Sequence, residues 1–439
     1  MKKLTLLLLT ILAFSDNLTI YNSNLANINT TKNFNVVKGI QTLEFPNFPS
    51  SIISDSIIPN FSKNITLLEQ SFLSNRTSIE SILKLNLKKR VKFYPTSKQD
   101  KLLEGELINT NPITIKANEE YFIINNPTDI IYKEYPKGLS KASIKWRVDA
   151  KKDLKESVQI DYLARGFNWY TNYVASLNKK TLNLKAFTTI SNRSGKDFKD
   201  ANVSLIAGKL NTDSTTPKML SRAVYKEAVA VNSSVIRATK LSNYYKYKIP
   251  FKVNLLDNES KQIAIIDAKD VKYNSYGLAY NSNFSNYGKQ KLNFKRHISF
   301  VNSKSNNLGL PLPQGKIRAY SSGVYIGESN IQNTPNKEKI DIAIGDLFDI
   351  VGEKIITKYI IKEKYRNLET TYNLKNRSKN SVTLKIKEQI PRYGNSIKKE
   401  SSCSNICSKK DESAFVSVYT IELKPNSSYE FKSSFEIFR

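Results

Sequence analysis

The chain has 439 residues, of which 40% are hydrophobic and 24% are charged. This composition supplies enough apolar material for folded cores and excludes a wholly disordered chain, and the length predicts about three domains. The formal net charge is +29, from 68 basic and 39 acidic residues. With one histidine and two cysteines, the chain lacks the ligands for His-rich or Cys-rich zinc sites, and a catalytic triad would depend on His297.

The N-terminal segment has the pattern of an export signal. Lys2 and Lys3 precede a mainly apolar run over residues 4–12, and the small residues Ala13 and Ser15 follow it. We expect cleavage after Ser15, because this order of basic, apolar and small residues is typical of a signal peptide. The apolar run is too short for a membrane-spanning helix, which needs about 20 residues. The mature protein is therefore expected to be secreted or periplasmic and envelope-associated, with no transmembrane segment.

The N-terminal third shows short strand patterns. Residues 16–85 contain several β-type runs and end in one helical stretch, which Thr77 or Ser78 would cap. Residues 86–136 contain five short apolar runs separated by polar turns. This spacing predicts a small SH3-like barrel, which would serve as a binding module or as a spacer.

Alternation of apolar and polar residues dominates the rest of the chain and predicts an all-β fold of antiparallel β-sandwich parts. The first part of this domain is expected over residues 137–210 and the remaining part over residues 246–439. The N-terminal β segment, residues 16–85, either stands alone or completes the first sandwich. Residues 211–245 lack clean alternation, which predicts a mobile linker with one helical stretch near residues 222–231.

The basic residues are spread through the strands. Lysines occupy alternate positions in runs such as KTLNLKAF and VTLKIKEQI, which is typical of the solvated face of a half-buried sheet. A nucleic-acid-binding protein usually gathers its basic residues on one helix or patch, so we expect no nucleic-acid partner. Attraction to an anionic partner, such as an acidic glycan, a lipid head group or an acidic protein, is the functional alternative.

The two cysteines, Cys403 and Cys407, lie in a segment rich in Ser and Lys between two strand-like runs. In an oxidising compartment we expect them to form a disulfide at the tip of a hairpin. Because the closed loop is small, its gain in chain entropy is modest. A redox-active pair is the alternative, for which this spacing gives weak support.

Aromatic residues provide one candidate ligand site. Trp169, Tyr170 and Tyr173 lie within one strand-like run and are the candidates for an aromatic platform that binds a glycan or a peptide. The structural alternative is burial in a core, where such side chains supply a large apolar area. His297 lies on an alternating strand on the same face as Lys295, and we expect it to be solvated.

Two further patterns have both a functional and a structural interpretation. Asp346 and Asp349, with Glu353 nearby, supply the pair of carboxylates that a glycosidase needs, although spacing alone is weak evidence. The turn at residues 192–195 could present backbone donors to an anion, but a hairpin turn is the simpler interpretation.

Several segments resemble the family called domain of unknown function 4139. The resemblance to the core of the family lies in YLARGFNWYTNYVASL and LKAFTTISNRSGKDFKDANVSLIAGKLN. The resemblance to the later signature of the family lies in LGLPLPQGKIRAYSS and IGESNIQNTPNKEKIDIAIGDLFDI. Its C-terminal segment resembles YNLKNRSKNSVTLKIKEQIP, and its N-terminal strand pair resembles VVKGIQTLEFPNFPSSIISDSI. The run KWRV, which follows the small barrel-like unit, also resembles the family pattern.

The resemblance covers most of residues 30–439, apart from residues 211–245 and the cysteine loop. It implies an all-β secreted or envelope protein and no established activity. Relatives include the mucoidy-inhibitor A group, many of which carry a long coiled coil after the N-terminal strands. Residues 62–85 are too short for such a coiled coil, which argues against assembly through one.

We therefore expect a non-catalytic binding or assembly module of the envelope, whose partner is a protein or an anionic envelope polymer. The alternative is a hydrolase of envelope glycan or peptide that uses a carboxylate pair, and a purely structural tether also fits the all-β organisation. The chain has no Walker loop and no GxGxxG, GxSxG or HExxH motif. We accordingly predict no catalytic residue, no cofactor and no metal ligand. The sequence does not predict the oligomeric state.

Overall fold

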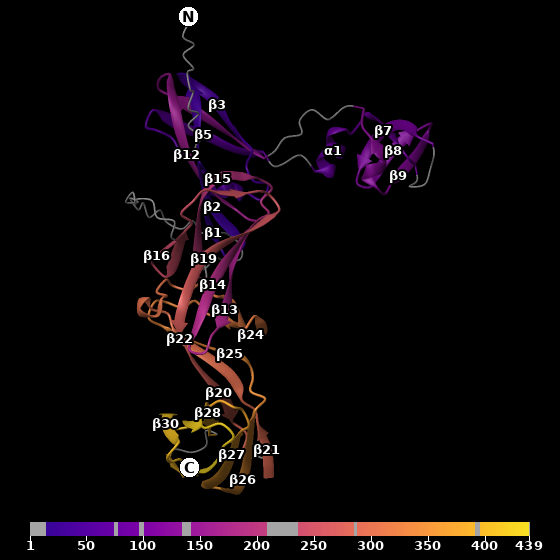
Figure 1. Cartoon of the computed structure of the whole chain (residues 1–439). Coiled ribbons are helices and arrows are strands. Elements are labelled where there is room, and N and C mark those ends of the chain that lie inside the picture. Colours follow the sequence, from indigo (N-terminus) through magenta and orange to yellow (C-terminus); the bar gives the residue numbers. More distant parts are fainter. Residues whose placement is uncertain are drawn as a thin grey trace, which may run out of the picture. The chain divides into compact units, whose positions relative to one another are not determined.

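The computed structural model describes residues 15–73, 78–95, 101–133, 142–208, 236–284, 288–390 and 396–438 (Figure 1). The expected signal peptide lies outside these residues except for Ser15, and so does the helical stretch expected near residues 222–231. The chain divides into two compact units. Unit 1 comprises Met1–Trp169 and Ile190–Lys261, and unit 2 comprises Tyr170–Thr189 and Gln262–Arg439.

The described part of the chain is nearly all β-structure, which confirms the expected all-β class. Its strands form several sheets, and most neighbouring strands are antiparallel. The described helices are short: α1 (Ile79–Leu85) and three 3-10 turns, Ser54–Ser56, Pro127–Asp129 and Lys304–Asn306. Among the described residues, no helix has the length and apolarity needed to cross a lipid bilayer.

The largest sheet of unit 1 has eight strands. Their order is β16 (Arg237–Leu241), β17 (Tyr244–Lys248), β15 (Phe198–Ala207), β1 (Asn17–Tyr21), β2 (Leu25–Val36), β12 (Leu154–Ala164) and β4 (Ile58–Asn60), with β18 (Val253–Leu255) paired to β15. β1 runs parallel to β15, and β2 pairs with β12 along its length. The N-terminal strands therefore complete a sheet together with strands from residues 137–210.

β16 lies within the segment expected to be a mobile linker, so the C-terminal end of that prediction is corrected. Arg237–Leu241 pairs antiparallel with β17 at the edge of the eight-stranded sheet. None of its five side chains is fully buried. An exposed edge strand has no apolar face, so it leaves no alternation in the sequence from which to predict it.

A three-stranded sheet of unit 1 has the order β3 (Gly39–Pro46), β11 (Ser143–Ala150) and β5 (Ile65–Leu73). Trp146 on β11 is fully buried, and its indole N–H donates to the side-chain oxygen of Gln70 at 2.7 Å. The rings of Phe45 and Phe61 lie within 6.5 Å and 5.7 Å of the Trp146 ring. These aromatic contacts make Trp146 a core residue, which stabilises the sheet through its large buried area.

The region expected to be an SH3-like barrel forms an open sheet. Its order is β10 (Ile130–Ile131), β6 (Arg90–Phe93), β7 (Leu103–Thr110), β8 (Ile113–Ala117) and β9 (Glu120–Ile124). In the described residues, the two edge strands β9 and β10 do not pair, so the barrel prediction is corrected. β10 is only two residues long, and Leu83 of α1 packs into the apolar core of the sheet. Ser78 caps α1, because its hydroxyl accepts from the backbone N–H of Ser81 at 3.2 Å.

Unit 2 is built mainly from three sheets. The first has the order β19 (Glu259–Lys272), β14 (Thr181–Asn192), β13 (Phe167–Leu177), β23 (Gly315–Ser321) and β24 (Val324–Ile331). The second has the order β25 (Lys339–Asp346), β22 (Lys295–Val301), β20 (Asn274–Asn281), β28 (Val382–Gln389), β31 (Val416–Leu423) and β30 (Cys407–Ser413). The third has the order β21 (Gly288–Leu292), β26 (Ile350–Lys362), β27 (Tyr365–Asn376), β32 (Ser428–Phe438) and β29 (Ser396–Ser401).

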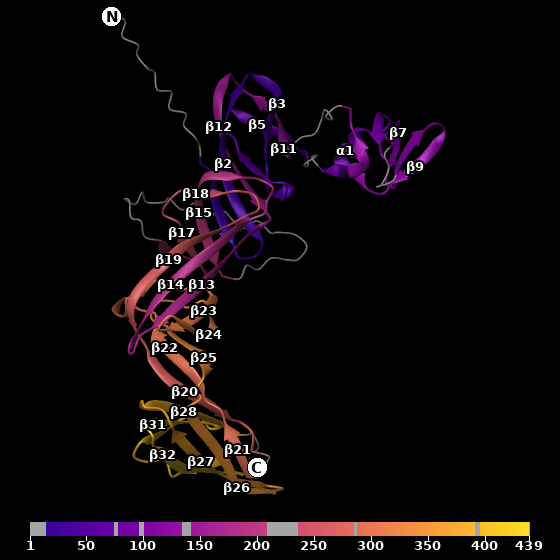
Figure 2. The same ribbon diagram turned by 45° about the vertical axis from the view of Figure 1, so that its right-hand side comes forward.

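The six-stranded sheet contributes to two cores. β22 and β25 share an apolar core with the five-stranded sheet of β13, which includes Phe300, Ile342 and Leu184. β20, β28 and β31 share another core with β26, β27 and β32, which includes Ile386 and Leu374. The strands of unit 2 named here (Figure 2) therefore pack in layers, and the face of β25, β22, β20 and β28 that points away from these cores is free of them.

Candidate functional site

Four neighbouring strands of the six-stranded sheet present polar side chains on one face. Successive side chains of a strand point to opposite faces, so the buried Ile340 and Ile342 of β25 alternate with polar residues. The register pairs Tyr276 with His297 and Ser299 with Asp341, so these residues share that outer face. The same face also carries Lys339, Asn274, Thr383 and Lys385.

This face lines a pocket of about 340 Å³. Four lysines line it: Lys179, Lys180, Lys339 and Lys385. The other lining residues are neutral and polar: Tyr273, Asn274, Ser275, Tyr276, Ser299 and Thr383. All of these residues belong to unit 2. Ligand sites are usually concave, and a few converging polar groups fix the orientation of the ligand.

A second pocket of about 410 Å³ adjoins the first. The two share four lining residues: Tyr273, Asn274, Ser299 and Lys339. The second pocket also has Lys272, Ser303, Ser305 and Asn306 in its lining, together with Phe300 and Val301. No carboxylate side chain lines either pocket, as far as the described residues show. The combined lining is therefore cationic.

Two of the lysines come from the turn of the β13–β14 hairpin. Lys179 and Lys180 are exposed. Asn178 closes this turn by donating its backbone N–H to the carbonyl of Thr181 at 2.8 Å. The hydroxyl of Tyr273 donates to the Asn178 carbonyl, also at 2.8 Å, and so fixes the turn beside the start of β20.

Two carboxylates border the first pocket: Glu422 accepts from the hydroxyl of the lining residue Thr383 at 2.8 Å, and Asp341 is held by three neighbours. Its oxygens accept from the Tyr276 hydroxyl, lie 3.0 Å from Nδ1 of His297 and lie 3.3 Å from Nζ of Lys339. Burial alone would raise the pKa of Asp341, but the hydrogen bonds from Tyr276, His297 and Lys339 outweigh it and hold the pKa below its ordinary value. Asp341 is therefore ionised at neutral pH, and its single negative charge compensates only part of the positive charge of the pocket lysines.

Tyr276 holds the centre of the pocket floor in place. Its side chain is 7% exposed, and its ring stacks on His297 at a centroid distance of 5.4 Å. Nζ of Lys385 lies 4.1 Å from the centroid of the same ring, a cation–π contact that fixes this ammonium group. Burial, followed by the hydrogen bond to Asp341, raises the pKa of Tyr276, so the phenol stays neutral.

The predicted aromatic platform is not present as an exposed surface. Trp169 is 5% exposed and packs on Tyr247 at 6.3 Å, and Tyr173 is fully buried with its hydroxyl donating to the Pro313 carbonyl at 2.6 Å. Only Tyr170 is exposed, at 55%. Trp169 and Tyr173 occupy inward positions of β13, so the pleat of the strand explains the correction.

The predicted carboxylate pair lies outside both pockets. Asp346 forms an exposed ion pair with Lys295 at 3.1 Å, and Glu353 pairs with Lys289 at 2.9 Å. Asp349 is exposed, and its backbone carbonyl accepts from the N–H of Arg377 at 2.9 Å. These contacts give the acidic residues structural partners on the surface.

His297 differs from the expectation of a solvated strand residue. Its side chain is 16% exposed and is held between Asp341 and Tyr276. The pairing of β22 with β25 shifts register between Arg296 and His297. This irregularity in the ladder could not be predicted from simple alternation.

The turn at residues 192–195 is structural. Asn192 is fully buried, and its side chain donates to the carbonyls of Lys196 and Leu255. Gly195 has a φ of +83°, and a side chain there would lie 2.1 Å from Oγ of Ser50. Its backbone N–H already donates to Asp257 at 2.8 Å. The turn therefore has no free donors of the kind that an anion site needs.

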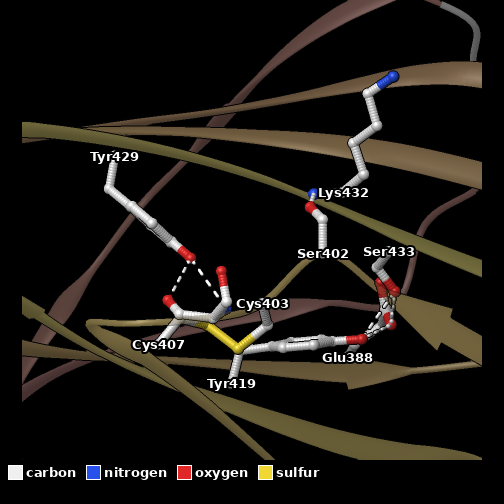
Figure 3. Close-up of a disulfide and its surroundings, with 9 residues drawn as sticks. Glu388, Ser402, Cys403, Cys407, Tyr419, Tyr429, Lys432 and Ser433 are labelled. Carbon is white, nitrogen blue, oxygen red and sulfur yellow. Dashed lines mark hydrogen bonds between the residues drawn. A yellow bond between two sulfur atoms is a disulfide. The ribbon is translucent and has the colours of Figure 1, made fainter.

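Cys403 and Cys407 are bonded to each other, with an S–S distance of 2.00 Å (Figure 3). The expectation of a hairpin tip is corrected. β29 pairs with β32, whereas β30 pairs with β31, so the loop between β29 and β30 connects two different sheets. The Tyr429 hydroxyl holds this loop by donating to the Ser404 carbonyl at 2.9 Å. Cys407 belongs to the apolar core beneath.

Near the disulfide lies a buried polar network around Glu388 (Figure 3), which continues from Tyr372 through Asn281 to Lys354. Glu388 is 1% exposed and accepts from the hydroxyls of Tyr372 at 2.6 Å, Ser433 at 2.8 Å and Tyr419 at 3.3 Å. Burial raises the pKa of Glu388 above its ordinary value, although these hydrogen bonds act in the opposite direction. Because its partners are buried protein groups, the network is a part of the core.

The pocket lysines were not identified as a site from the sequence, although the alternating pattern to which Lys385 belongs was noted. Lys385 belongs to VTLKIKEQI, whose lysines were assigned to a solvated face. That assignment is right for the strand taken alone. The pocket arises because the sheet order places β20 between β28 and β22, an arrangement that pairs segments far apart in the sequence. In the part of the chain that the structure describes, no cluster of His, Cys, Asp and Glu could hold a metal ion.

Comparison with known proteins identifies a family whose description names no activity. Residues 158–438 match the family described as Domain of unknown function (DUF4139). The match starts within β12 and extends to the end of β32, so the part of the resemblance before residue 158 stays a prediction. No curated protein matches the chain. Because the match spans well over half of the sequence, this chain belongs to the DUF4139 family.

Proposed function

We propose that this chain is a non-catalytic binding module of the cell envelope and that the lysine-lined pockets of unit 2 hold an anionic ligand. The observation that carries the proposal is the lining of the first pocket, which has four lysines and no carboxylate among its residues. The expected export signal supports a location outside the cytoplasm, and the paired sheets of unit 2 are interpreted as the expected β-sandwich parts.

The charge arrangement favours an anion for a physical reason. Cationic side chains that line one concave surface create a positive potential there, which attracts an anionic ligand. Several lysines elsewhere on strands pair with acidic residues, as Lys316 does with Glu328 and Lys289 does with Glu353. In the pocket, Asp341 is shared between Lys339 and His297, which leaves Lys179, Lys180 and Lys385 without compensation by a lining carboxylate.

The test uses the two hairpin-turn lysines, because they are exposed and their side chains do not build the fold. The probe is tetragalacturonate, a linear sugar chain with one carboxylate on each unit. We expect Lys179→Gln combined with Lys180→Gln to weaken its binding about ten-fold, since each exposed charge contact contributes up to about 1 kcal/mol. The measurement is isothermal titration calorimetry at about 150 mM salt, where exposed charges beyond the site are screened.

A matched control removes the same charge from a similar place. Lys151 and Lys152 are adjacent exposed lysines in the short connection between β11 and β12 of unit 1, two strands that belong to different sheets. The double variant Lys151→Gln/Lys152→Gln is expected to bind as the unaltered protein does. Equal weakening in both double variants would mean that binding follows net charge, and the pocket would then not be the site.

A further inference from the structure

We infer that the two pockets form one continuous groove that binds a linear acidic oligosaccharide across several sugar units. This inference rests on the proposed anion-binding function and names the class of ligand. Its first support is the shared lining: Tyr273, Asn274, Ser299 and Lys339 border both pockets. A ligand that fills one pocket therefore reaches the other without leaving the surface of the sheet.

The positions of the lysines require a ligand with more than one negative charge. Lys385 lies on β28 and Lys339 on β25, and these two strands are separated by three strand spacings in the sheet. At about 4.8 Å per spacing, the two Cα positions are at least roughly 14 Å apart. Lys272, at the end of β19, extends the cationic lining into the second pocket. A single small anion contacts only a part of this row, whereas a chain with a charge on each unit can contact all of it.

The neutral lining residues favour sugar over other polyanions. Between the lysines lie hydroxyl and amide side chains, such as Asn274 and Thr383 in the first pocket and Ser305 in the second. The Thr383 hydroxyl donates to the Glu422 carboxylate at 2.8 Å and keeps its acceptor capacity, and the Ser305 hydroxyl lies 3.0 Å from that of Ser303. Such groups both donate and accept, as sugar hydroxyls do. The Asn306 side chain, by contrast, donates to the carbonyls of Lys272 and Val301 and so holds the second pocket in shape.

An acidic peptide fits this surface less well. Peptides commonly bind by adding a strand to a free sheet edge. β25, which carries Lys339, is the terminal strand of this sheet, whereas the floor strands β20 and β22 lie inside it, since β20 pairs with β22 and β28, and β22 also pairs with β25. Their backbone groups are therefore used within the sheet, and only side chains face the groove.

The experiment compares ligands of equal chemistry and different length. Galacturonate, digalacturonate and tetragalacturonate are titrated into the full-length mature chain, its hairpin variant Lys179→Gln/Lys180→Gln and the control variant Lys151→Gln/Lys152→Gln. We expect the tetramer to bind at least ten-fold more tightly than the monomer. The hairpin variant should lose most of this gain, and neutral maltotetraose should not bind measurably.

Two other results would overturn the inference while leaving the anion site intact. If the monomer and the tetramer bind equally and both depend on Lys179 and Lys180, the pockets act separately and the groove is not continuous. If tetraglutamate, with one carboxylate per residue, binds as tightly as tetragalacturonate, the ligand class is not a glycan. If the hairpin variant binds every probe as the control variant does, the proposed function itself fails.

Discussion

Polar residues have opposite environments on the two faces of β28. On its outer face, Lys385 lies against Tyr276 in a cationic pocket, and the described lining adds no carboxylate to compensate it. On its inner face, Glu388 is buried and bonded to three hydroxyl groups of the core. The comparison gives the physical basis of the proposal: satisfaction of polar groups, and not polarity itself, distinguishes the structural cluster from the proposed binding site. A satisfied network stabilises one packing, whereas an uncompensated one attracts a ligand.

The largest effect is expected at the buried carboxyl group. Glu388→Ala removes the acceptor of the Tyr372 and Ser433 hydroxyls and leaves a cavity, so the free energy of unfolding should fall by about 3 kcal/mol. Urea unfolding followed by circular dichroism measures this change. Glu388→Gln keeps the shape and an acceptor oxygen, and it should cost less than half as much. A loss below about 1 kcal/mol for the alanine variant would show that the network is not a structural part of the core.

The pH dependence of the same pair of proteins sharpens the comparison. Because burial raises the pKa of Glu388 above its ordinary value of 4.5, the folded chain binds more protons than the unfolded chain above that value. Its stabilising contribution is full below the unfolded pKa and declines as the pH rises towards the folded pKa. The unaltered protein should therefore lose stability relative to Glu388→Gln as the pH rises from 4.5 through the raised pKa of the folded state. A pH-independent difference between the two would contradict the raised pKa.

The next effect concerns the connection between sheets. Cys403 and Cys407 close a small loop, and the loop-entropy relation predicts that the bond stabilises the fold by about 2 kcal/mol. Reduction, or the double variant Cys403→Ser/Cys407→Ser, should lower the midpoint of urea unfolding accordingly. The intact mass of the unreduced protein should be two hydrogens below that of the reduced protein. Equal masses would mean that the thiols are free in solution.

On the outer face, removing a negative charge should improve binding. Asp341→Asn frees Lys339 from its partner and makes the pocket more cationic, so tetragalacturonate should bind about three-fold more tightly. Stability should fall modestly above the pH at which Asp341 ionises. Because the pKa of Asp341 is lowered, its contribution to stability is present above the unfolded pKa of 3.8 and is lost as the pH falls through the folded value. Weaker binding by the variant would show that Asp341 holds the ligand or shapes the pocket.

The sequence predicted what depends on local periodicity and missed what depends on strand order. Alternation of apolar and polar residues along β13 and β28 predicted strands, and Cys403 and Cys407 were expected to form a disulfide. The inward positions of Trp169 and Tyr173 depend on which face of β13 meets a core, and periodicity does not give that.

The site shows the same limit. Lys180, Lys339 and Lys385 come from three segments that are far apart in the chain, and only the pairing of their strands and turns brings them to one pocket. The family resemblance gave the correct membership, but it carried no residue roles. Long-range pairing of β-strands therefore decides the candidate site here, because no single segment contains enough of it to form a motif.

The smallest effect is expected for the carboxylates that a hydrolase would use. Asp346 is 58% exposed in its ion pair with Lys295, and Asp349 is exposed on the same turn. Exposed pairs contribute less than about 1 kcal/mol, so Asp346→Asn combined with Asp349→Asn should leave stability nearly unchanged. Binding of tetragalacturonate should also stay the same, because neither residue lines a pocket. If envelope glycan is cleaved by the unaltered protein and not by this variant, the outer face is a catalytic surface, and the contrast between the two faces of β28 would need a different explanation.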